Sequence, residues 1–459
     1  MKKVLFISLA LVLALSVGLV GCADGAAAPT AIKIGLVRDL TGGLIFYDWA
    51  AGGPVYRALN TTVNADGGLY MSGYGKKLPI ELVVRPYDFL SAADLELQTE
   101  ALITLDKVHF LFGGPGTTTV YTQAAVADAY GMLLMTLEGG ATDMLADPEK
   151  LASWSNTFIN LSFSDWYQIP VLHAMLDDQA LPDGDRAPKA YVIYINNEHG
   201  AEYLLTTQNV FGAGNVTASG HAWNADYDAI EDQIVAAKTA LNVSGNNDDY
   251  DIFCAYTYDP ILPDVIAACA ALDFDPPAIM LGPGSSGGLY YFFVGDNLEG
   301  MCGFAVANNK TVITETTTMS LPAMWDLVKA EGGGGFPPQH YWDVWAHPVL
   351  WAGLEMWKEA VKTVGHLDLG YTGLVRNVLV SFNESNPCTT VIGDCWYKVY
   401  GAGLGGGVID YQCMPGQISQ WQDAYCEIVG PSDITNTIPK YSITASFNYP
   451  MTGNWTWLD

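Results

Sequence analysis

The chain alternates short, continuously apolar runs with longer segments whose apolar residues recur at helical spacing. In its first half, apolar runs lie at 32–37, 80–84, 108–112 and 132–135, and helical patterns cover 53–64, 92–105 and 120–130. Strands that are apolar throughout are buried on both faces, and helices between such strands form the connections of a parallel sheet. This half therefore predicts an α/β unit whose parallel sheet is covered by helices on both sides.

The same rhythm restarts after Leu161 and predicts a second α/β unit of similar size. Helical patterns cover 166–176, 202–211, 230–241 and 262–272, and apolar runs lie at 191–195, 250–254 and 278–281. A long helix is expected over 342–364, and its aromatic residues fall near the spacing of a buried face. From Cys388 onward the chain is rich in Gly, Asn, Tyr and Trp, which predicts short strands and loops. The predicted fold class is α/β, with two Rossmann-like units and a Cys- and aromatic-rich C-terminal extension.

The first 22 residues follow a different pattern. Lys2 and Lys3 precede an apolar run from Val4 to Val20, and Leu19-Val20-Gly21-Cys22 closes it. A basic start, an apolar stretch and a small-residue cleavage site are typical of an export signal. A cysteine directly after Leu-x-Gly resembles a bacterial lipobox, which predicts a signal peptide over 1–21, lipidation of Cys22 and a tether over 22–30. An ordinary secretory signal with a chance cysteine is the alternative.

The charge balance excludes some classes of partner. The formal net charge is −29, and removing Lys2 and Lys3 with the signal takes it from −29 to −31. Such a chain has no basic patch to neutralise the phosphates of nucleic acid or of anionic lipid. After Val20 no apolar run approaches the ~20 residues that a membrane span needs, so we expect membrane attachment only through the lipid anchor.

Seven cysteines remain after Cys22, and export permits disulfides. Close spacing predicts the pairs Cys388–Cys395 and Cys413–Cys426, and the odd number leaves at least one thiol over. No Cys-x-x-Cys occurs, and no histidine lies at ligand spacing to a cysteine pair. We therefore expect no metal and no cofactor.

Five short motifs carry a resemblance to a known family. They are Ile32-Lys33-Ile34-Gly35-Leu36-Val37-Arg38-Asp39-Leu40-Thr41-Gly42, Asn64-Ala65-Asp66-Gly67-Gly68, Phe112-Gly113-Gly114-Pro115-Gly116-Thr117-Thr118-Thr119, Gly140-Ala141-Thr142 and Leu298-Glu299-Gly300-Met301. In order and spacing they resemble the type I periplasmic binding proteins of the branched-chain amino-acid group. These are the solute receptors of ABC importers. The resemblance runs from about Ile32 to Tyr400.

The resemblance implies two lobes joined by three crossovers, near Asn160, Cys302 and Val399. Lobe I would comprise 31–160 plus 303–398, and lobe II 161–302 plus 399–459. Ligand would bind between the lobes at the carboxyl ends of the strands, where open α/β sheets collect ligands in general. The implied function is that of a lipid-anchored protein in the periplasm or on the cell surface. It would bind a small polar organic molecule and present it to an ABC permease, without catalysis.

The glycine loop Gly113–Thr119 lies between a predicted strand and a predicted helix. Glycines let a backbone approach a ligand closely, and a helix start offers free N–H groups and the positive end of its dipole. In the family this loop and the Ala-Thr loop grip the ligand carboxylate; here the threonines could instead be plain N-caps. The ligand-binding candidates are Tyr47, Thr117, Thr118, Gly140, Ala141, Thr142, Trp166, His199, Tyr258 and Ser285.

One departure from the family concerns the ligand ammonium group. Amino-acid binders place an acidic residue after the strand that matches 278–281, whereas here Gly282-Pro283-Gly284-Ser285-Ser286-Gly287 follows. A buried ammonium without a partner would cost several kcal/mol. We therefore expect a carboxylate, an amide or another small polar molecule rather than a standard α-amino acid, unless Asp259 reaches the site.

Three other functions are compatible with parts of the sequence. Gly284-Ser285-Ser286-Gly287-Gly288 matches the Gly-x-Ser-x-Gly pattern of serine hydrolases, but its Gly/Pro-rich surroundings do not favour a tight nucleophile turn. Asp183-Gly184-Asp185 and Asn246-Asn247-Asp248-Asp249 are acidic enough for calcium but are typical of turns. A two-lobed receptor could also report its ligand to a signalling partner, and the sequence does not separate sensing from import.

Overall fold

The first sheet has seven strands in the order β15-β16-β7-β6-β5-β1-β4. In a computed structural model, the chain is described over residues 28–136, 139, 154–160, 168–179, 186–242, 249–258, 260–282, 287–332, 343–367, 369–399, 406–410, 412–413, 416–430 and 441–458. It divides into two units, residues 1–30 and 31–459, and everything below concerns the second. The predicted signal peptide and Cys22 lie outside the described residues.

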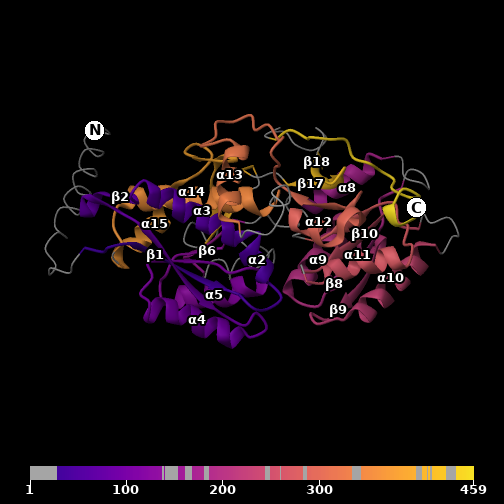
Figure 1. Cartoon of the computed structure of the whole chain (residues 1–459), viewed down its shortest axis with the longest axis horizontal. Helices are drawn as coiled ribbons and strands as arrows, with labels where there is room; N and C mark the ends of the chain where they lie inside the picture. The colour runs from indigo at the N-terminus through magenta and orange to yellow at the C-terminus, as the bar shows by residue number, and fades with distance from the viewer. Residues whose placement is uncertain are drawn as a thin grey trace, which may run out of the picture. The chain divides into compact units, whose positions relative to one another are not determined.

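All strands of this sheet run parallel except β15, which is antiparallel to β16 at the edge. The strands are β1 (Ile32–Arg38), β4 (Ile80–Pro86), β5 (Phe110–Phe112), β6 (Leu134–Thr136), β7 (Thr157–Ile159), β15 (Tyr397–Val399) and β16 (Gly407–Ile409). The helices are α2 (Ile45–Trp49), α3 (Gly52–Ala65), α4 (Ala92–Thr104), α5 (Thr117–Ala129), α13 (Leu321–Glu331), α14 (Ala346–Val364) and α15 (Leu369–Ser381). Figure 1 shows α4 and α5 on one side of this sheet and α3 and α14 on the other.

The second sheet repeats this plan in the order β18-β17-β12-β11-β10-β8-β9. Its strands are β8 (Ala190–Ile195), β9 (Val216–His221), β10 (Ile252–Tyr256), β11 (Ile279–Leu281), β12 (Cys302–Ala305), β17 (Gln417–Gln422) and β18 (Tyr425–Gly430). Its helices are α8 (Ile169–Asp177), α9 (Glu198–Phe211), α10 (Tyr227–Leu241), α11 (Leu262–Ala271) and α12 (Gly288–Val294). Two further hairpins pair β2 (Leu69–Met71) with β3 (Lys76–Leu78) and β13 (Cys388–Thr390) with β14 (Gly393–Cys395). The predicted α/β fold with two lobes is confirmed.

Two of the three crossovers lie further along the chain than predicted. The first passes from β7 to α8, as expected near Asn160. The second follows β12, which belongs to the second sheet, so lobe II extends past Cys302 to Ala305. The third lies between β16 and β17 rather than near Val399, because β16 pairs with β7 of the first sheet. Both strands are three or four residues long, and β16 begins inside a glycine run, so neither carries a periodic signal.

Local capping explains where several helices begin. A side-chain oxygen just before the helix accepts a hydrogen bond from a backbone N–H of the first turn, which satisfies one of the groups that a helix start leaves unpaired. These caps are Ser91 before α4, Asn197 before α9, Asp226 before α10 and Ser320 before α13.

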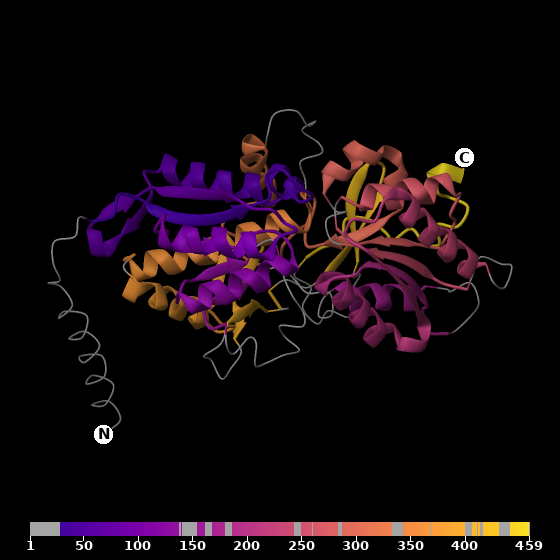
Figure 2. The ribbon, with the colours of Figure 1, turned by 90° about the horizontal axis from the view of Figure 1, so that it is seen from below.

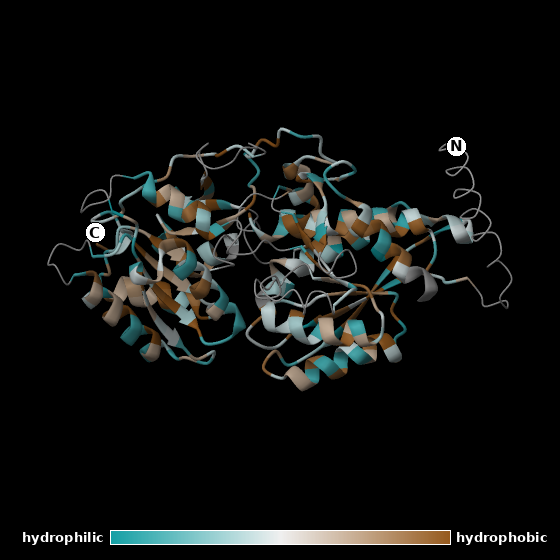
Figure 3. Cartoon of the chain, turned by 180° about the vertical axis from the view of Figure 1, so that it is seen from behind, coloured by the Kyte–Doolittle hydropathy of each residue, from teal (hydrophilic) through white to brown (hydrophobic). Residues whose placement is uncertain are grey.

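The hydrophobic core lies between the sheets and their helices, and Figure 3 shows the strands mostly brown. In the first lobe, the Trp357 ring of α14 is fully buried. It meets Phe110 and Phe112 of β5 edge-on, with ring centroids 5.5 and 5.2 Å apart. Edge-to-face contact of this kind is the favoured packing of aromatic pairs. The prediction that the aromatic residues of this helix belong to the core is confirmed.

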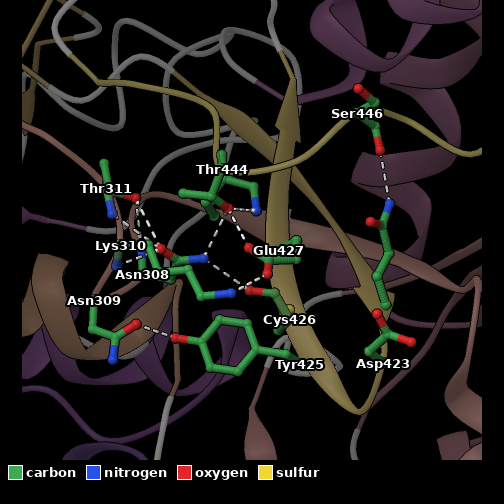
Figure 4. Close-up of polar contacts among 12 residues, drawn as sticks. Asn308, Asn309, Lys310, Thr311, Asp423, Tyr425, Cys426, Glu427, Thr444 and Ser446 are labelled. Atoms are coloured by element: carbon green, nitrogen blue, oxygen red, sulfur yellow. Dashed lines mark hydrogen bonds and ion pairs between the residues drawn. The ribbon is translucent and has the colours of Figure 1, made fainter.

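A polar cluster around Asn308 secures the second crossover (Figure 4). The Asn308 amide donates to the Cys426 carbonyl at 3.1 Å and to Thr444 Oγ1 at 3.2 Å, and its oxygen accepts from the Lys310 N–H at 2.9 Å. The Lys310 ammonium pairs with Glu427 and lies 4.0 Å from the centre of the Tyr425 ring. The crossover is therefore fastened to β18 of the second sheet.

The C-terminal segment 441–458 is an ordered strap. At its start, the Tyr441 hydroxyl lies within hydrogen-bond distance of the carbonyls of Ile392 (3.0 Å) and Cys413 (2.9 Å). At its end, the indole N–H groups of Trp455 and Trp457 donate to the carbonyls of Pro276 and Phe274 at 2.9 and 3.0 Å. Figure 2 shows the C-terminus beside the second lobe. The extension therefore covers the α11–β11 connection.

None of the seven described cysteines forms a disulfide. Cys388 and Cys395 lie directly opposite each other across the β13–β14 hairpin, a register that suits a disulfide. Their pairing stays a prediction. Cys413 follows β16 of the first sheet and contacts Trp396 through its sulfur, whereas Cys426 lies on β18 of the second sheet. The structure therefore does not pair Cys413 with Cys426, because the intervening strands change sheets.

The strap should contribute strongly to stability. Trp455 is 1% exposed, so Trp455→Ala leaves a large cavity and should lower the free energy of unfolding by about 3–5 kcal/mol. Trp455→Phe, which keeps one aromatic ring and loses the rest of the indole with its N–H, should lower it by about 1–3 kcal/mol. Tyr70→Ala, at a side chain 56% exposed, should stay within about 0.5 kcal/mol. Urea unfolding measures all three, and equal effects of Trp455→Ala and Tyr70→Ala would contradict a structural role for the strap.

Candidate functional site

The start of α5 presents the clearest binding feature of the first lobe. β5 ends at Phe112, a glycine loop follows, and α5 begins at Thr117, which is 3% exposed. Gly116 has φ of +86°, a conformation that favours glycine. A Cβ at this residue would lie 3.4 Å from the Tyr258 hydroxyl. The helix has no side-chain N-cap, so the threonines of this turn are not capping residues. The start of α5 contacts α9 of the second lobe.

The start of α9 lies opposite, in the second lobe. Asn197 caps this helix by accepting from the Gly200 N–H at 3.1 Å, which places Glu198, His199 and Glu202 on its first turns. Thr118 Oγ1 donates to Glu198 Oε2 at 3.0 Å. This hydrogen bond joins the two lobes. We call the region between the start of α5, the start of α9 and the loops after β4, β9 and β10 the seam.

Tyr258 crosses the seam from the loop after β10. Its ring is 1% exposed, and its hydroxyl lies against Thr117. Burial raises the pKa of this phenol most strongly, the nearby carboxylates Glu202 and Glu198 raise it further, and Thr117 opposes the shift. A neutral phenol therefore occupies the position in front of the α5 N-terminus.

His199 stacks on Tyr258, with ring centroids 4.5 Å apart and the planes 18° from parallel. It is 4% exposed, and burial lowers its pKa from 6.5 to about 3. Its Nε2 has no hydrogen-bond partner among the described residues. The imidazole is therefore neutral at pH 7 and leaves one polar atom available at the seam.

Three more aromatic contacts complete the seam. Phe89, after β4 of the first lobe, meets Trp223, after β9 of the second, with centroids 4.7 Å apart. Tyr258 lies 6.0 Å from Phe89 and 5.1 Å from Trp223. A Cβ at Gly43 would lie 3.2 Å from side-chain atoms of both Trp223 and Pro260, so the glycine permits the close approach of the lobes. In this arrangement the protein's own rings fill the seam.

The structure brings four predicted site residues together: Thr117, Thr118, His199 and Tyr258. Tyr47 is different, because it is buried in α2 and belongs to the main hydrophobic core. Its placement does not support a role at the seam. The candidates Gly140, Ala141, Thr142, Trp166 and Ser285 lie outside the described residues. So do Asp259, the Ser286 of the hydrolase-like pattern, Asp183–Asp185 and most of the second acidic run.

Sequence reasoning missed four residues of the seam: Phe89, Trp223, Glu198 and Glu202. Trp223 follows β9, a mostly exposed or half-buried strand without an apolar run, and Phe89 follows β4, which the apolar pattern predicted. The two glutamates change one expectation. The absence of an acid after β11 was the reason to exclude an ammonium group, yet α9 places two carboxylates near Tyr258 instead. That reason no longer holds.

Metal binding finds no support among the described side chains, since no group of three or more His, Cys, Asp or Glu residues is arranged to hold an ion. Within the same residues, no helix has the length and apolar character that a membrane crossing requires.

Comparison with known proteins addresses the fold. No protein-family model and no curated protein matches the sequence. Solved structures do match, at 15% identity and a TM-score of 0.65 for a periplasmic binding protein type 1 from Bordetella pertussis, which covers 87% of this chain and 100% of that one. The chain has the type I periplasmic-binding-protein fold.

Two other proteins of this fold were solved with their ligands. The branched-chain amino acid transporter substrate-binding protein LivJ from Streptococcus pneumoniae, in complex with isoleucine, matches at 16% identity and a TM-score of 0.64, over 87% of this chain and 100% of that one. A solute-binding protein of an ABC transporter from R. palustris, in complex with benzoate, matches at 15% identity and a TM-score of 0.62, over 89% and 100%.

Acid should weaken the closed seam of this type I fold. His199 must take up a proton in any state that exposes it, at a pKa near 6.5, but resists protonation to about 3 while buried. The free energy of unfolding therefore keeps its full value above about pH 6.5. It falls as the pH drops, by about 2 kcal/mol at pH 5, because the exposed imidazole takes up a proton that the buried one does not. Urea unfolding at pH 7 and pH 5 should show a larger loss for the natural chain than for His199→Gln. The same loss in both would contradict the burial of a neutral imidazole.

Proposed function

We propose that this protein is the extracytoplasmic solute-binding component of an ABC importer. It binds a small polar organic molecule at the seam and presents it to a membrane permease, and it carries out no chemical reaction. One observation carries the proposal: the N-terminus of α5, on one lobe, lies opposite Tyr258, His199 and Glu198 on the other lobe. Loops at the carboxyl ends of both sheets meet there, which is where open α/β sheets bind ligands.

The comparisons support the same class of protein. Several of the similar structures are substrate- or solute-binding proteins of ABC transporters, and the two described above hold isoleucine and benzoate, both small carboxylates. A carboxylate suits the start of α5, because the N–H groups and the dipole of a helix start attract negative charge. The Thr117 and Thr118 hydroxyls add donors at that point.

Binding requires the lobes to separate first. Phe89, Trp223 and Tyr258 contact one another in the present arrangement. Solute would enter an open state and replace the contact between Thr117 and Tyr258. Its bonds to both lobes would then favour a closed state with solute inside. The permease would recognise that state.

Membrane attachment is part of the proposal. The lipobox-like sequence ending at Cys22 would provide a lipid anchor, and the segment 22–30 would link it to the folded lobes. Mass spectrometry of the protein expressed in a bacterium should find a diacylated or triacylated Cys22 as the first residue. An unmodified mature chain that begins elsewhere would contradict this part of the proposal.

Solute binding is tested by native mass spectrometry of the freshly purified protein, followed by calorimetric titration with any retained molecule. The titrations also include leucine, isoleucine, valine, benzoate and small amides. Thr117→Val should weaken the binding of a carboxylate solute at least ten-fold, since it removes a hydroxyl donor to a charged group. Thr122→Val is the matched control, because that hydroxyl donates to the Thr118 carbonyl of its own helix at 3.4 Å.

The outcomes separate the parts of the proposal. No retained molecule and no binding of any solute would contradict a solute receptor. Binding that is equally strong in Thr117→Val and Thr122→Val would contradict the placement of the site. Sub-micromolar binding of leucine, isoleucine or valine would contradict only the expectation that the ligand is not a standard amino acid.

A further inference from the structure

We infer that the solute carries an alkylated ammonium group, which is held by the aromatic box of Phe89, Trp223 and Tyr258 beside the carboxylates of α9. The inference rests on the proposed function and specifies the chemical class of its ligand. It concerns the half of the solute that faces the second lobe.

The geometry of the aromatic box is the first observation. The ring planes are steeply inclined to one another, at 87° between Phe89 and Tyr258, 66° between Trp223 and Tyr258, and 47° between Phe89 and Trp223. Rings so inclined do not form a flat stack, and their faces can serve as walls of one site when the lobes part. Aromatic faces carry negative potential, so walls of this kind attract a cation at their centre.

The lobes control access to the box. Two walls, Trp223 and Tyr258, belong to the second lobe, and the third, Phe89, belongs to the first. At centroid distances of 4.7 to 6.0 Å the rings touch, so the box is closed upon itself in this arrangement. Separation of the lobes withdraws Phe89 and opens the box. A cation would then join the two lobes when they close again.

The charges around the box favour a cation. Glu198 and Glu202 both lie near enough to Tyr258 to act on its hydroxyl, and Glu202 is 8% exposed. His199, stacked on the same ring, is neutral and adds no opposing charge. The net charge of −29 raises the local concentration of cations around the whole molecule. The aromatic box, which bridges the lobes, therefore lies in a negative field.

The polar atoms of the seam favour an alkylated ammonium over a plain one. A plain ammonium has three N–H donors that need acceptors when buried. Glu198 Oε2, on the second lobe's side of the seam, already accepts a hydrogen bond from Thr118 Oγ1. An alkylated ammonium has few or no N–H donors, and its methyl groups bury apolar surface against the rings. His199 Nε2, buried without a partner among the described residues, remains for a polar group elsewhere on the solute.

Matched pairs of probes isolate the positive charge. Glycine betaine and 3,3-dimethylbutanoate have the same shape and the same carboxylate, and differ in a nitrogen cation against a neutral carbon. Choline and 3,3-dimethylbutan-1-ol form the corresponding pair without a carboxylate. Titration of the full chain by calorimetry, with tryptophan fluorescence as a second readout, gives the affinity for each. We expect the cation of at least one pair to bind ten-fold or more tightly than its neutral counterpart.

Variants then locate the charge recognition. Phe89→Leu and Trp223→Leu keep apolar side chains but remove one wall each, and both should lower the affinity for the preferred cation at least ten-fold. Phe292→Leu, at an exposed ring of α12, is the control and should leave it unchanged. Thermal unfolding of each variant establishes that it is folded. Because two rings are substituted separately, the test remains valid if one variant does not fold.

Each result bears on the inference. Equal binding within both pairs, or a preference for the neutral members, would overturn it. So would a cation preference that survives both wall substitutions. Tight binding of benzoate or leucine with no cation preference would overturn the inference and leave the proposed function standing. Binding of no probe and no retained molecule would overturn both.

Discussion

The contact between the α5 N-terminus and the second lobe is the interaction on which the rest of this structure depends. The residue before the helix, Gly116, has no side chain that could cap it. The second lobe brings the Glu198 carboxylate to the Thr118 hydroxyl and the Tyr258 phenol to Thr117. These contacts join the lobes at the helix start, and a solute with suitable groups can replace them.

The connections between the lobes allow this exchange while fixing its geometry. The chain crosses between the sheets three times, and the Asn308 cluster fastens the second crossover to β18 through hydrogen bonds and an ion pair. The strap adds a further tie, because Tyr441 contacts the carbonyls of Ile392 and Cys413 while Trp455 is held by Pro276. These contacts fasten the connecting segments to the lobes on either side.

Sequence reasoning predicted most of the fold because long segments carry clear periodicity. The helices α3, α4, α10, α11 and α14 and the strands β1, β4, β8 and β10 lie where the apolar pattern placed them. The short strands β12 and β16 have no such pattern, and this displaced two predicted crossovers. The start of α5 was identified through its glycine loop, which has a recognisable spacing. Phe89 and Trp223 follow strands, but no sequence motif surrounds them. Their contact could therefore not be predicted from the sequence and becomes apparent only in the fold. The close spacing of Cys388 and Cys395 agrees with their positions opposite each other in one hairpin. Cys413 and Cys426 are also close in sequence, but the chain changes sheets between them.

A distance measurement between the lobes tests the central claim most directly. Spin labels at Ala129→Cys, on the exposed end of α5, and Ala236→Cys, on the exposed face of α10, report the separation, since the described native cysteines are buried. Double electron–electron resonance without solute should give a broad distribution that includes distances longer than the closed form. Saturation with a bound solute should leave one narrow, short distance. A single distribution that does not change when a bound solute is added would contradict two lobes that close around a ligand.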